Sequence, residues 1–459
     1  MEVFMRLRSS LPDCPWYFGL PCALGGLAIV IFILFGVQFL TLGSAAARTA
    51  VVLVLLLAVL LALVLLRYEG CPDMTLLLLF LPIAAAVYLR LLCLDHQTHD
   101  YYTFLAEWAA FFRENGGFSA IKLPLGDYNA PYLYFLAAIS YLPVPDLYLI
   151  KVFSILFDVL LAWGGLRLTR QFCQENSPAP LVCFVLLLLL PTVVLNGAYW
   201  SQCDSLYVSL TLLALSFALE HHPKTSVLLL AAAFSFKLQT VFLIPLWCVF
   251  WYTGRVKFRH LLLFPAGYLA TILPALALGK PLGDILGVYL GQAEEYRDYL
   301  TLNAPSVFSF LPHGAQVNTA LASRLGIAAA FLLVFILLGL LFRRRKKITP
   351  DLLLSTAAVL AIGVPFLLPS MHDRYFMLAD VITLVWACAD RRRFPAALLA
   401  EASSLSCYCT YLRLRYTLPI YLGGQYYVMA FEAALMLTAL IWSLTLWVKQ
   451  FKNCALKTC

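Results

Sequence analysis

Acidic and imidazole side chains gather in one short polar stretch of an otherwise apolar chain. Residues 94–102 contain two aspartates and two histidines, directly after a long apolar run. A carboxylate placed there can take a proton from an attacking hydroxyl group, provided that it stays ionised. Asp95 and Asp100 are therefore both candidates for a general base. Two other interpretations are open: Asp100 could cap a helix that begins at Tyr101, or the four side chains could hold a divalent metal ion, although no cofactor is required.

Two more polar clusters follow along the chain. Residues 126–132 combine Gly, Asn and Pro with Asp127 and Tyr128, a composition typical of a turn. Residues 196–205 form the second cluster, and its candidate binding residues are Trp200, Gln202 and Asp204. The alternatives are again structural, because Asp204 could cap the next helix and Trp200 could belong to an aromatic belt at the membrane surface.

Three cationic or titratable groups suit an anionic ligand. Lys237 ends the apolar run 225–237, and the run 239–253 follows it; each run is too short to cross a hydrocarbon core of about 30 Å. These arms predict a hairpin that enters from the cytoplasm and buries Lys237 at its apex, where a charge is functional by default. His372 and Arg374 share one polar turn, and a guanidinium fork beside an imidazole matches a phosphate group.

The composition of the whole chain explains why these polar groups stand out. Of 459 residues, 63% are hydrophobic and 12% are charged, and the mean hydropathy is +0.87. Soluble domains have about 45–50% apolar and about 25% charged residues, so a soluble enzyme, a disordered protein and a fibrous repeat are all excluded. The net charge of +8 is interpreted as a record of membrane orientation, and no nucleic-acid partner is expected.

The apolar runs predict an all-α polytopic membrane protein with about fourteen membrane segments, twelve of them long. The predicted segments are 18–42, 49–66, 74–93, 147–168, 180–197, 203–220, 225–237, 239–253, 261–279, 323–342, 349–368, 374–390, 396–412 and 425–448. With a cytoplasmic N-terminus, 20 of the 32 Lys and Arg residues lie on the inside. This bias predicts that both termini are cytoplasmic.

This topology places two long polar loops, 94–146 and 280–322, on the outer side of the membrane. Within the first loop, residues 101–114 carry Phe104, Trp108 and other aromatic residues at helical spacing. Such a stretch predicts a helix that lies in the membrane interface rather than crossing it. Because the acids gather in an outer loop and not at the midplane, the pattern favours a reaction at the membrane surface over transport.

Taken in order, these pieces resemble the class C glycosyltransferases, multi-pass membrane enzymes that use polyprenyl-phosphate-linked sugars. The chain is similar to bacterial relatives of the GPI-anchor mannosyltransferases and the dolichol-linked-oligosaccharide glucosyltransferases. The matching pieces are Asp100 with Trp108, Asp127-Tyr128 with Pro131, the stretch 199–207 (similar to a Trp-Gly-Gln-x-Asp element), Lys237 with Gln239, and Met371 to Phe376 (similar to a His-Glu-Arg-Tyr element). Ser201 and Asp373 depart from this pattern, since Gly and Glu are usual there.

The resemblance implies an inverting transfer of a hexose, mannose most closely, from a polyprenyl-phosphate donor to a glycan or lipid-linked acceptor. It implies that Asp100 is the base, with Asp95 as the alternate, and that Lys237, His372 and Arg374 hold the donor phosphate. The pocket for the sugar and the acceptor would be formed by Asp127, Tyr128, Trp108, Trp200, Gln202 and Asp204. The implied location is a bacterial cell membrane, with the active site on the outer face.

The resemblance covers residues 74–390, which predicts a catalytic membrane core flanked by N-terminal helices (1–73) and C-terminal helices (391–459). Two other functions are open. A polymerase or ligase of lipid-linked glycans would use a lipid-diphosphate donor. A flippase or transporter of lipid-linked sugars would need charges along a midplane path, and the sequence places only Lys237 clearly there.

Overall fold

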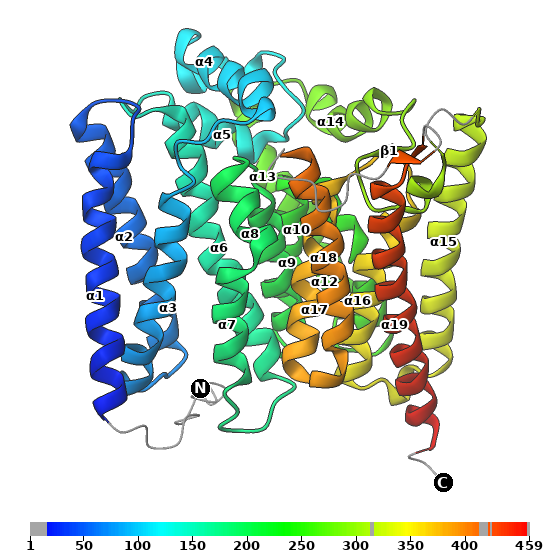
Figure 1. Cartoon of the computed structure of the whole chain (residues 1–459). Coiled ribbons are helices and arrows are strands. Elements are labelled where there is room, and N and C mark those ends of the chain that lie inside the picture. The colour runs from blue at the N-terminus through cyan, green and yellow to red at the C-terminus, as the bar shows by residue number, and fades with distance from the viewer. Residues whose placement is uncertain (1–15, 313–315, 413–420, 423–424, 457–459) are drawn as a thin grey trace. The chain divides into compact units, whose positions relative to one another are not determined.

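The computed structural model describes residues 16–312, 316–412, 421–422 and 425–456 (Figure 1). These residues are largely helical, and their strands are only two residues long, which confirms the predicted all-α class. The chain forms two compact units: unit 1 comprises residues 1–126 and 132–212, and unit 2 comprises 127–131 and 213–459. The domain limits predicted after residues 73 and 390 fall inside these units. Both chain termini lie outside the described residues.

Unit 1 is built from long helices with a short helical layer across one end (Figure 1). Its elements are α1 (Trp16–Phe39), α2 (Ala45–Tyr68), α3 (Asp73–Leu91), η1 (Tyr101–Leu105), α4 (Ala106–Glu114), η2 (Gly117–Lys122), α5 (Ala130–Ile139), α6 (Asp146–Arg170), α7 (Ala179–Leu189), α8 (Pro191–Val194), η3 (Leu195–Tyr199) and the start of α9 (Asp204–Leu219). Helix α2 packs against α1, α3 and α6, and α6 also packs against α7. The predicted interfacial stretch 101–114 forms η1, a π-helical turn, followed by α4.

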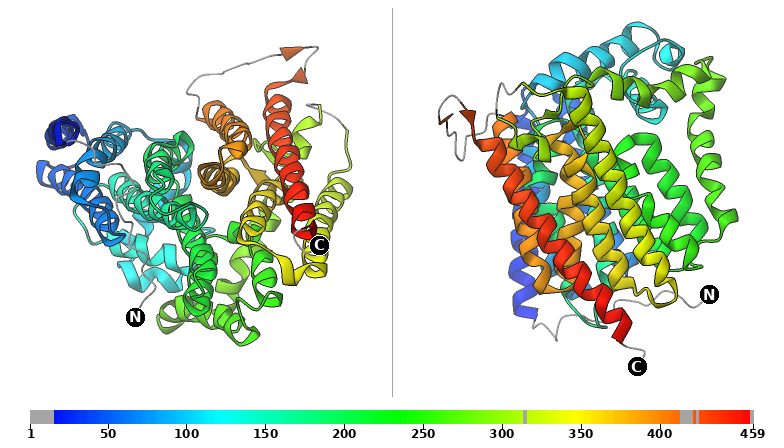
Figure 2. Two further views of the ribbon diagram at one scale, coloured as in Figure 1. Left: turned by 90° about the horizontal axis from the view of Figure 1, so that it is seen from below. Right: turned by 90° about the vertical axis from the view of Figure 1, so that its right-hand side faces the viewer.

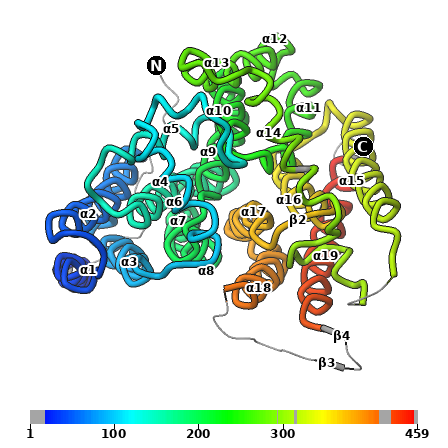
Figure 3. Tube along the Cα trace, turned by 90° about the horizontal axis from the view of Figure 1, so that it is seen from above, coloured from blue at the N-terminus to red at the C-terminus, as the bar shows by residue number. Residues whose placement is uncertain are grey.

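Unit 2 surrounds the buried helix α16. Its elements are α10 (Pro223–Phe236), η4 (Leu238–Phe242), α11 (Pro245–Tyr252), α12 (Phe258–Leu261), α13 (Leu263–Ala277), α14 (Leu282–Glu295), β1 (Thr301–Leu302), η5 (Val307–Phe310), α15 (Thr319–Arg343), η6 (Arg345–Lys347), α16 (Pro350–Leu367), β2 (Met371–His372), η7 (Asp373–Phe376), α17 (Met377–Ala389), η8 (Arg391–Arg393), α18 (Phe394–Tyr411), β3 (Tyr421–Leu422), β4 (Gln425–Tyr426) and α19 (Val428–Leu456). Helix α16 packs against α15, α17 and α19, which Figures 2 and 3 show around it.

Local sequence explains where several helices begin and end. Helix α16 begins with Pro350 at its first turn, where a missing N–H costs nothing, and the Thr349 side chain accepts from the Leu352 amide. Helix α2 is capped in the same way by Ser44. The hairpin joint is different, because Lys237 adopts an extended conformation (φ −148°, ψ 138°) that ends α10 before η4 begins.

Eight of the described helices are long and apolar enough to cross a membrane, and the bent pair 179–189 and 191–199 would make a ninth. This finding confirms a multi-pass membrane protein, but it does not confirm fourteen segments. The predicted segments 203–220 and 374–390 fold as α9 and α17, with 16 and 13 residues. A straight crossing takes about 20 residues, so these helices are short for that role. They lie among other helices in the described structure, and most of their residues are buried.

Helix α16 separates two chemically different ends of unit 2. The basic turn Arg343–Lys347 precedes its first residue, and the strand β2 follows its last. Strand β1 pairs in parallel with β2, so part of the polar loop 280–322 lies at the same end as His372. Within unit 2, His372 and the paired part of the loop 280–322, both predicted to lie outside, are therefore at one end of α16. The basic turn Arg343–Lys347 lies at the opposite end.

Candidate functional site

Asp100 is held by two side chains from the stretch 196–205, all within unit 1. Its Oδ2 atom accepts hydrogen bonds from Trp200 Nε1 and Gln202 Nε2, both at 3.0 Å, and only 8% of the residue is exposed. Asp100 precedes η1, but its side chain makes no capping hydrogen bond there. The interpretation of Asp100 as a helix cap is therefore wrong, and the indole and the amide orient its carboxylate instead.

The backbone around Trp200 and Gln202 is itself held on both sides. Thr98 Oγ1 donates to the Trp200 carbonyl at 3.0 Å, and Ser154 Oγ donates to the Gln202 carbonyl at 2.7 Å. Between them, Ser201 is fully buried and has φ = 70°, a left-handed conformation that glycine adopts more easily than serine. The turn that presents the two donors to Asp100 is therefore strained but well supported.

Asp204 lies just behind this turn and has a structural partner. Asn196 Nδ2 donates to Asp204 Oδ2 at 2.7 Å, and the Asp204 amide donates to Asn196 Oδ1 at 3.3 Å. Both residues are fully buried. This reciprocal pair joins η3 to the start of α9, so Asp204 helps to fix the turn, and its place in a binding pocket stays a prediction.

Asp95 lies apart from the partners of Asp100. It accepts from the Thr41 amide at 3.0 Å and from the Tyr148 hydroxyl, so it anchors the connection between α1 and α2. The neighbouring His96 ring stacks on Tyr199 at 3.7 Å between centroids, and burial lowers its pKa. Within the described ranges, no group of three or more His, Cys, Asp or Glu is arranged to hold a metal ion.

Lys151 is a buried cation that the sequence interpretation did not single out. Its ammonium group donates to the carbonyl oxygens of Cys93, Leu94 and His96 at 2.8, 3.0 and 2.6 Å, and the residue is fully buried. These carbonyls follow the end of α3, where a positive charge is favourable. Lys151 thereby fixes the start of the segment that carries Asp100. A lysine inside the predicted span 147–168 was the available signal.

A second unforeseen charge cluster joins three helices of unit 1. Arg90 Nε lies 2.7 Å from Asp158 Oδ2, with both side chains almost fully buried. Arg90 Nη1 also donates to the Leu188 carbonyl at 2.8 Å, and Ser205 donates to Asp158. Charges inside the predicted spans 74–93 and 147–168 were visible in the sequence, but nothing in the pattern paired them.

Trp108 packs against the glycine that closes the first loop. A Cβ atom built on Gly126 would lie 2.7 Å from the Trp108 ring, and Gly126 has φ = 60°. Only glycine fits this approach and conformation. The predicted turn after residue 125 is thus present. The Trp108 side chain, which is 9% exposed, packs against it.

In unit 2, Lys237 lies at the joint of the hairpin, as predicted, and is only 7% exposed. Its ammonium nitrogen is 5.6 Å from the centre of the Tyr128 ring, a distance typical of a cation–π contact. The other end of the hairpin is basic: α12 packs against α10, and its His260 faces the charge of Lys224. Lys237 therefore lies one helix length away from the basic end.

His372 lies close to both proposed phosphate-binding cations. Burial lowers its pKa well below the ordinary value, and the positive charges of Arg374 and Lys237 lower it further. The ring contacts Tyr296 and Tyr375 edge-on, at 5.7 and 5.5 Å between centroids. Its Nδ1 atom is buried without a hydrogen-bond partner among the described residues. The imidazole is therefore neutral at pH 7 and can act as a hydrogen-bonding group.

The two neighbours of His372 in the polar turn differ in role. Asp373 is fully buried and accepts from Asn303 Nδ2 at 3.1 Å, which ties the turn to the loop 280–322. Arg374 is partly exposed, and its guanidinium carbon lies 5.7 Å from the Tyr375 ring. The acid of this element thus ties the turn to the loop, whereas Arg374 lies beside an aromatic ring at a partly exposed position.

The short segment 127–131 belongs to unit 2 and is fastened to it by a buried asparagine. Asn129 Nδ2 donates to the hydroxyl oxygens of Tyr268 and Tyr289 at 3.0 and 3.4 Å. Gln292 of α14 donates to the Asp127 carbonyl. These contacts hold Tyr128 beside Lys237. Asn129 belongs to the predicted polar turn 126–132, but nothing in the pattern indicated that Asn129 or Gln292 would act as an anchor.

Glu295, the last residue of α14, and the following Tyr296 lie near Asp127. Burial raises the pKa of Asp127, and burial together with the charge of Asp127 raises the pKa of Glu295. Burial and the neighbouring charges of Glu295 and Asp127 raise the pKa of Tyr296 to about 12. Tyr296 therefore lies near Arg374 and near the carboxyl groups of Asp127 and Glu295, an arrangement suited to a ligand with both hydroxyl groups and a negative charge.

The predicted residues thus form two clusters, one in each unit. Asp100, Trp200 and Gln202 form the Asp100 cluster of unit 1. Lys237, His372, Arg374, Asp127 and Tyr128 form the cation cluster of unit 2. That both clusters face one cavity stays a prediction. Comparison with protein-family models and with curated proteins finds no match for this chain.

Proposed function

We propose that this chain is a membrane glycosyltransferase that moves a hexose from polyprenyl phosphate to an acceptor hydroxyl group. The observation that carries the proposal is the cation cluster, where Lys237 and Arg374 lie close enough to His372 to lower its pKa. Two cations and a neutral imidazole suit a phosphate group that gains charge as it leaves. The nearby Asp127, Glu295 and Tyr296 offer hydrogen bonds to sugar hydroxyl groups.

In the proposed reaction, the acceptor oxygen attacks the anomeric carbon from the face opposite the phosphate. The bond between that carbon and the phosphate oxygen breaks, and its electron pair leaves with polyprenyl phosphate. Asp100 takes the acceptor's proton, and configuration inverts. Trp200 and Gln202 support this role by orienting the carboxylate, which is nearly shielded from water. Because Asp95 has other partners, Asp100 is the better base.

Transport of lipid-linked sugars is the competing proposal, and the buried charges of unit 1 bear on it. Arg90, Asp158 and Lys151 lie within membrane segments, as a transport path would require. Each is almost completely buried, however, and engaged with carboxylate, hydroxyl or backbone partners. This arrangement is typical of helix packing and not of a water-lined path.

The test is incubation of the purified protein with polyprenyl-phosphate mannose, glucose, galactose or arabinose. Release of polyprenyl phosphate in the presence of an acceptor glycan is expected for one of these donors. Asp100→Asn should abolish release while donor binding persists, since an amide cannot take the proton. Glu107→Gln, an exposed carboxylate in the same loop, is the matched control. If none of the donors releases polyprenyl phosphate, and labelled lipid moves between the leaflets, the protein is a transporter instead.

A further inference from the structure

The turn between α15 and α16 consists of five consecutive cations. Arg343 ends α15, Arg344 follows, and Arg345–Lys347 form the 3-10 helix η6. These five residues line a recess of about 260 Å³. The recess lies at the end of unit 2 opposite His372, one α16 length away, so it is separate from the proposed active site.

Two guanidinium groups of this turn are fixed by aromatic rings. The Arg344 carbon lies 4.0 Å from the Phe451 ring, and its Nη1 donates to the Phe451 carbonyl. Arg345 lies 4.6 Å from the Phe342 ring and donates to the Phe342 carbonyl at 3.3 Å. Ring contacts of this kind orient an arginine without neutralising it. The turn is therefore an ordered set of cations.

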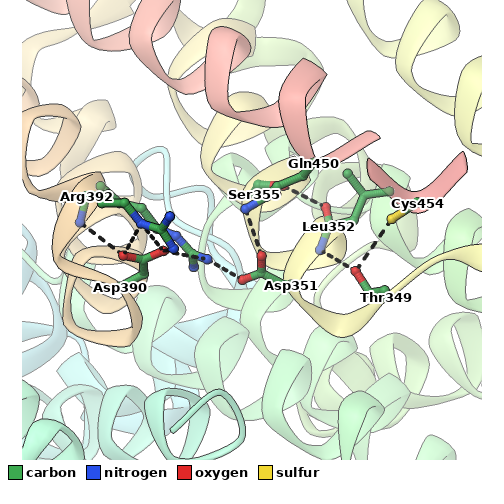
Figure 4. Close-up of polar contacts among 9 residues, drawn as sticks. Thr349, Asp351, Leu352, Ser355, Asp390, Arg392, Gln450 and Cys454 are labelled. Atoms are coloured by element: carbon green, nitrogen blue, oxygen red, sulfur yellow. Dashed lines mark hydrogen bonds and ion pairs between the residues drawn. The ribbon is translucent and has the colours of Figure 1, made fainter. Parts of the chain in front are cut away.

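Two carboxylates of unit 2, Asp351 and Asp390, are bound by cations outside this turn. Arg393 Nη2 lies 2.5 Å from Asp351. Arg392 binds Asp390 at 2.9 Å, a contact that Figure 4 shows. Gln450 also donates to Asp351, at 2.7 Å. Among the described residues, no carboxylate pairs with Arg343, Arg344, Arg345 or Lys346. Arg345 and Lys346 of η6 thus keep their charge, whereas Arg392 and Arg393 of η8 are paired with carboxylates.

The surroundings of the recess point to a ligand with apolar chains. Helix α15 has 25 residues and is one of the helices that can cross a membrane, so its last residue, Arg343, lies at the depth of lipid headgroups. Phe335, Ile336 and Phe342 on α15 are 65%, 49% and 50% exposed. A recess of cations beside such a face suits a phosphate group with acyl chains attached.

We propose that the Arg343–Lys347 turn binds the headgroup phosphate of an anionic phospholipid. The phosphate oxygens accept hydrogen bonds from the guanidinium and ammonium groups, and the acyl chains lie along the exposed face of α15. Attraction of this kind between basic clusters and anionic lipids adds with each cation. The proposal does not depend on the proposed transferase activity, because it concerns the opposite end of unit 2.

The experiment compares two double variants that each remove two exposed cations from a three-residue basic turn. Arg345→Gln with Lys346→Gln changes η6, and Arg391→Gln with Arg392→Gln changes η8. Each protein is placed in nanodiscs of phosphatidylcholine with a minor fraction of phosphatidylglycerol. The lipids that remain bound after release from the nanodisc are counted by native mass spectrometry, and melting temperature in detergent reports folding.

We expect the unchanged protein to retain phosphatidylglycerol in preference to phosphatidylcholine. The η6 variant should lose this preference at least tenfold, while the η8 variant keeps it and both melt as the unchanged protein does. Equal losses in both variants would show a general charge effect and overturn the site, as would no loss in the η6 variant. Displacement of the lipid by inorganic phosphate at low concentration would make the ligand a soluble anion and also overturn the proposal.

Discussion

At position 374, we expect the planar shape of the arginine side chain to matter for phosphate binding as well as its charge. Lysine at this position keeps the positive charge but loses the planar fork that matches two phosphate oxygens. Each charge-assisted hydrogen bond contributes about 1.5–3 kcal/mol. Arg374→Lys should therefore raise the apparent Kd for the donor lipid about tenfold to a hundredfold. Binding of a fluorescent polyprenyl phosphate checks this, and unchanged affinity would remove Arg374 from the phosphate site.

His372 gives unit 2 a defined pH dependence. Its pKa in the folded protein lies below the value of about 6.5 in the unfolded chain. The unfolded chain therefore binds the proton first, so the stability linked to His372 is complete above about pH 6.5 and is lost as the pH falls further. Melting temperatures measured across this range should fall less steeply for His372→Gln than for the unchanged protein. Parallel curves would contradict the burial of a neutral imidazole.

Substitutions of Ser201 test whether this strained residue supports the Asp100 cluster. Its φ of 70° and its buried hydroxyl, which has no described partner, both disfavour serine. Ser201→Gly should keep activity and raise stability by up to about 1 kcal/mol. Ser201→Val should lower both, because a β-branched residue fits this conformation poorly. Thermal melting in detergent, with transfer activity measured alongside, separates the two outcomes, and a stabilising valine would contradict the geometry.

At the scale of helices, the Arg90–Asp158 pair holds α3, α6 and α7 together. Removing one partner leaves a buried charge uncompensated and costs about 3–5 kcal/mol. Arg90→Met and Asp158→Leu should each lower the melting temperature strongly, whereas the double variant should recover much of the loss. If the double variant loses as much stability as the two single variants together, the two charges do not stabilise one another.

Sequence patterns predicted helices well and their partners poorly. The hairpin joint at Lys237 was predictable because two short apolar arms flank a charge, and the structure confirms its burial. Asp100 was foreseeable as a candidate, but its partners Trp200 and Gln202 lie a hundred residues away. Lys151 and Asn129 were missed since their roles depend on backbone carbonyls and hydroxyl groups brought near by folding. Hydrophobic periodicity records burial along one helix, not contacts between helices.

For the whole molecule, the testable property is sidedness. We expect Ser119 in the first polar loop to be outside and Lys346 in the basic turn to be inside. Single cysteines at these positions, in a background where the thirteen native cysteines are replaced by serine or alanine, should react with a membrane-impermeant maleimide from opposite sides. Intact cells and inverted vesicles make the comparison. Labelling of both positions from one side would overturn the predicted topology.

The short parallel pair of β1 and β2 has a consequence for the design of chimeric proteins. Ser370 donates to the carbonyl oxygens of Tyr296 and Tyr299, and Asn303 holds Asp373, so the loop and the turn are joined at both ends. A chimera that imports only one of them from another protein would break these bonds. Residues 296–303 and 370–374 should therefore be transferred together, as one unit, in any chimera with another protein.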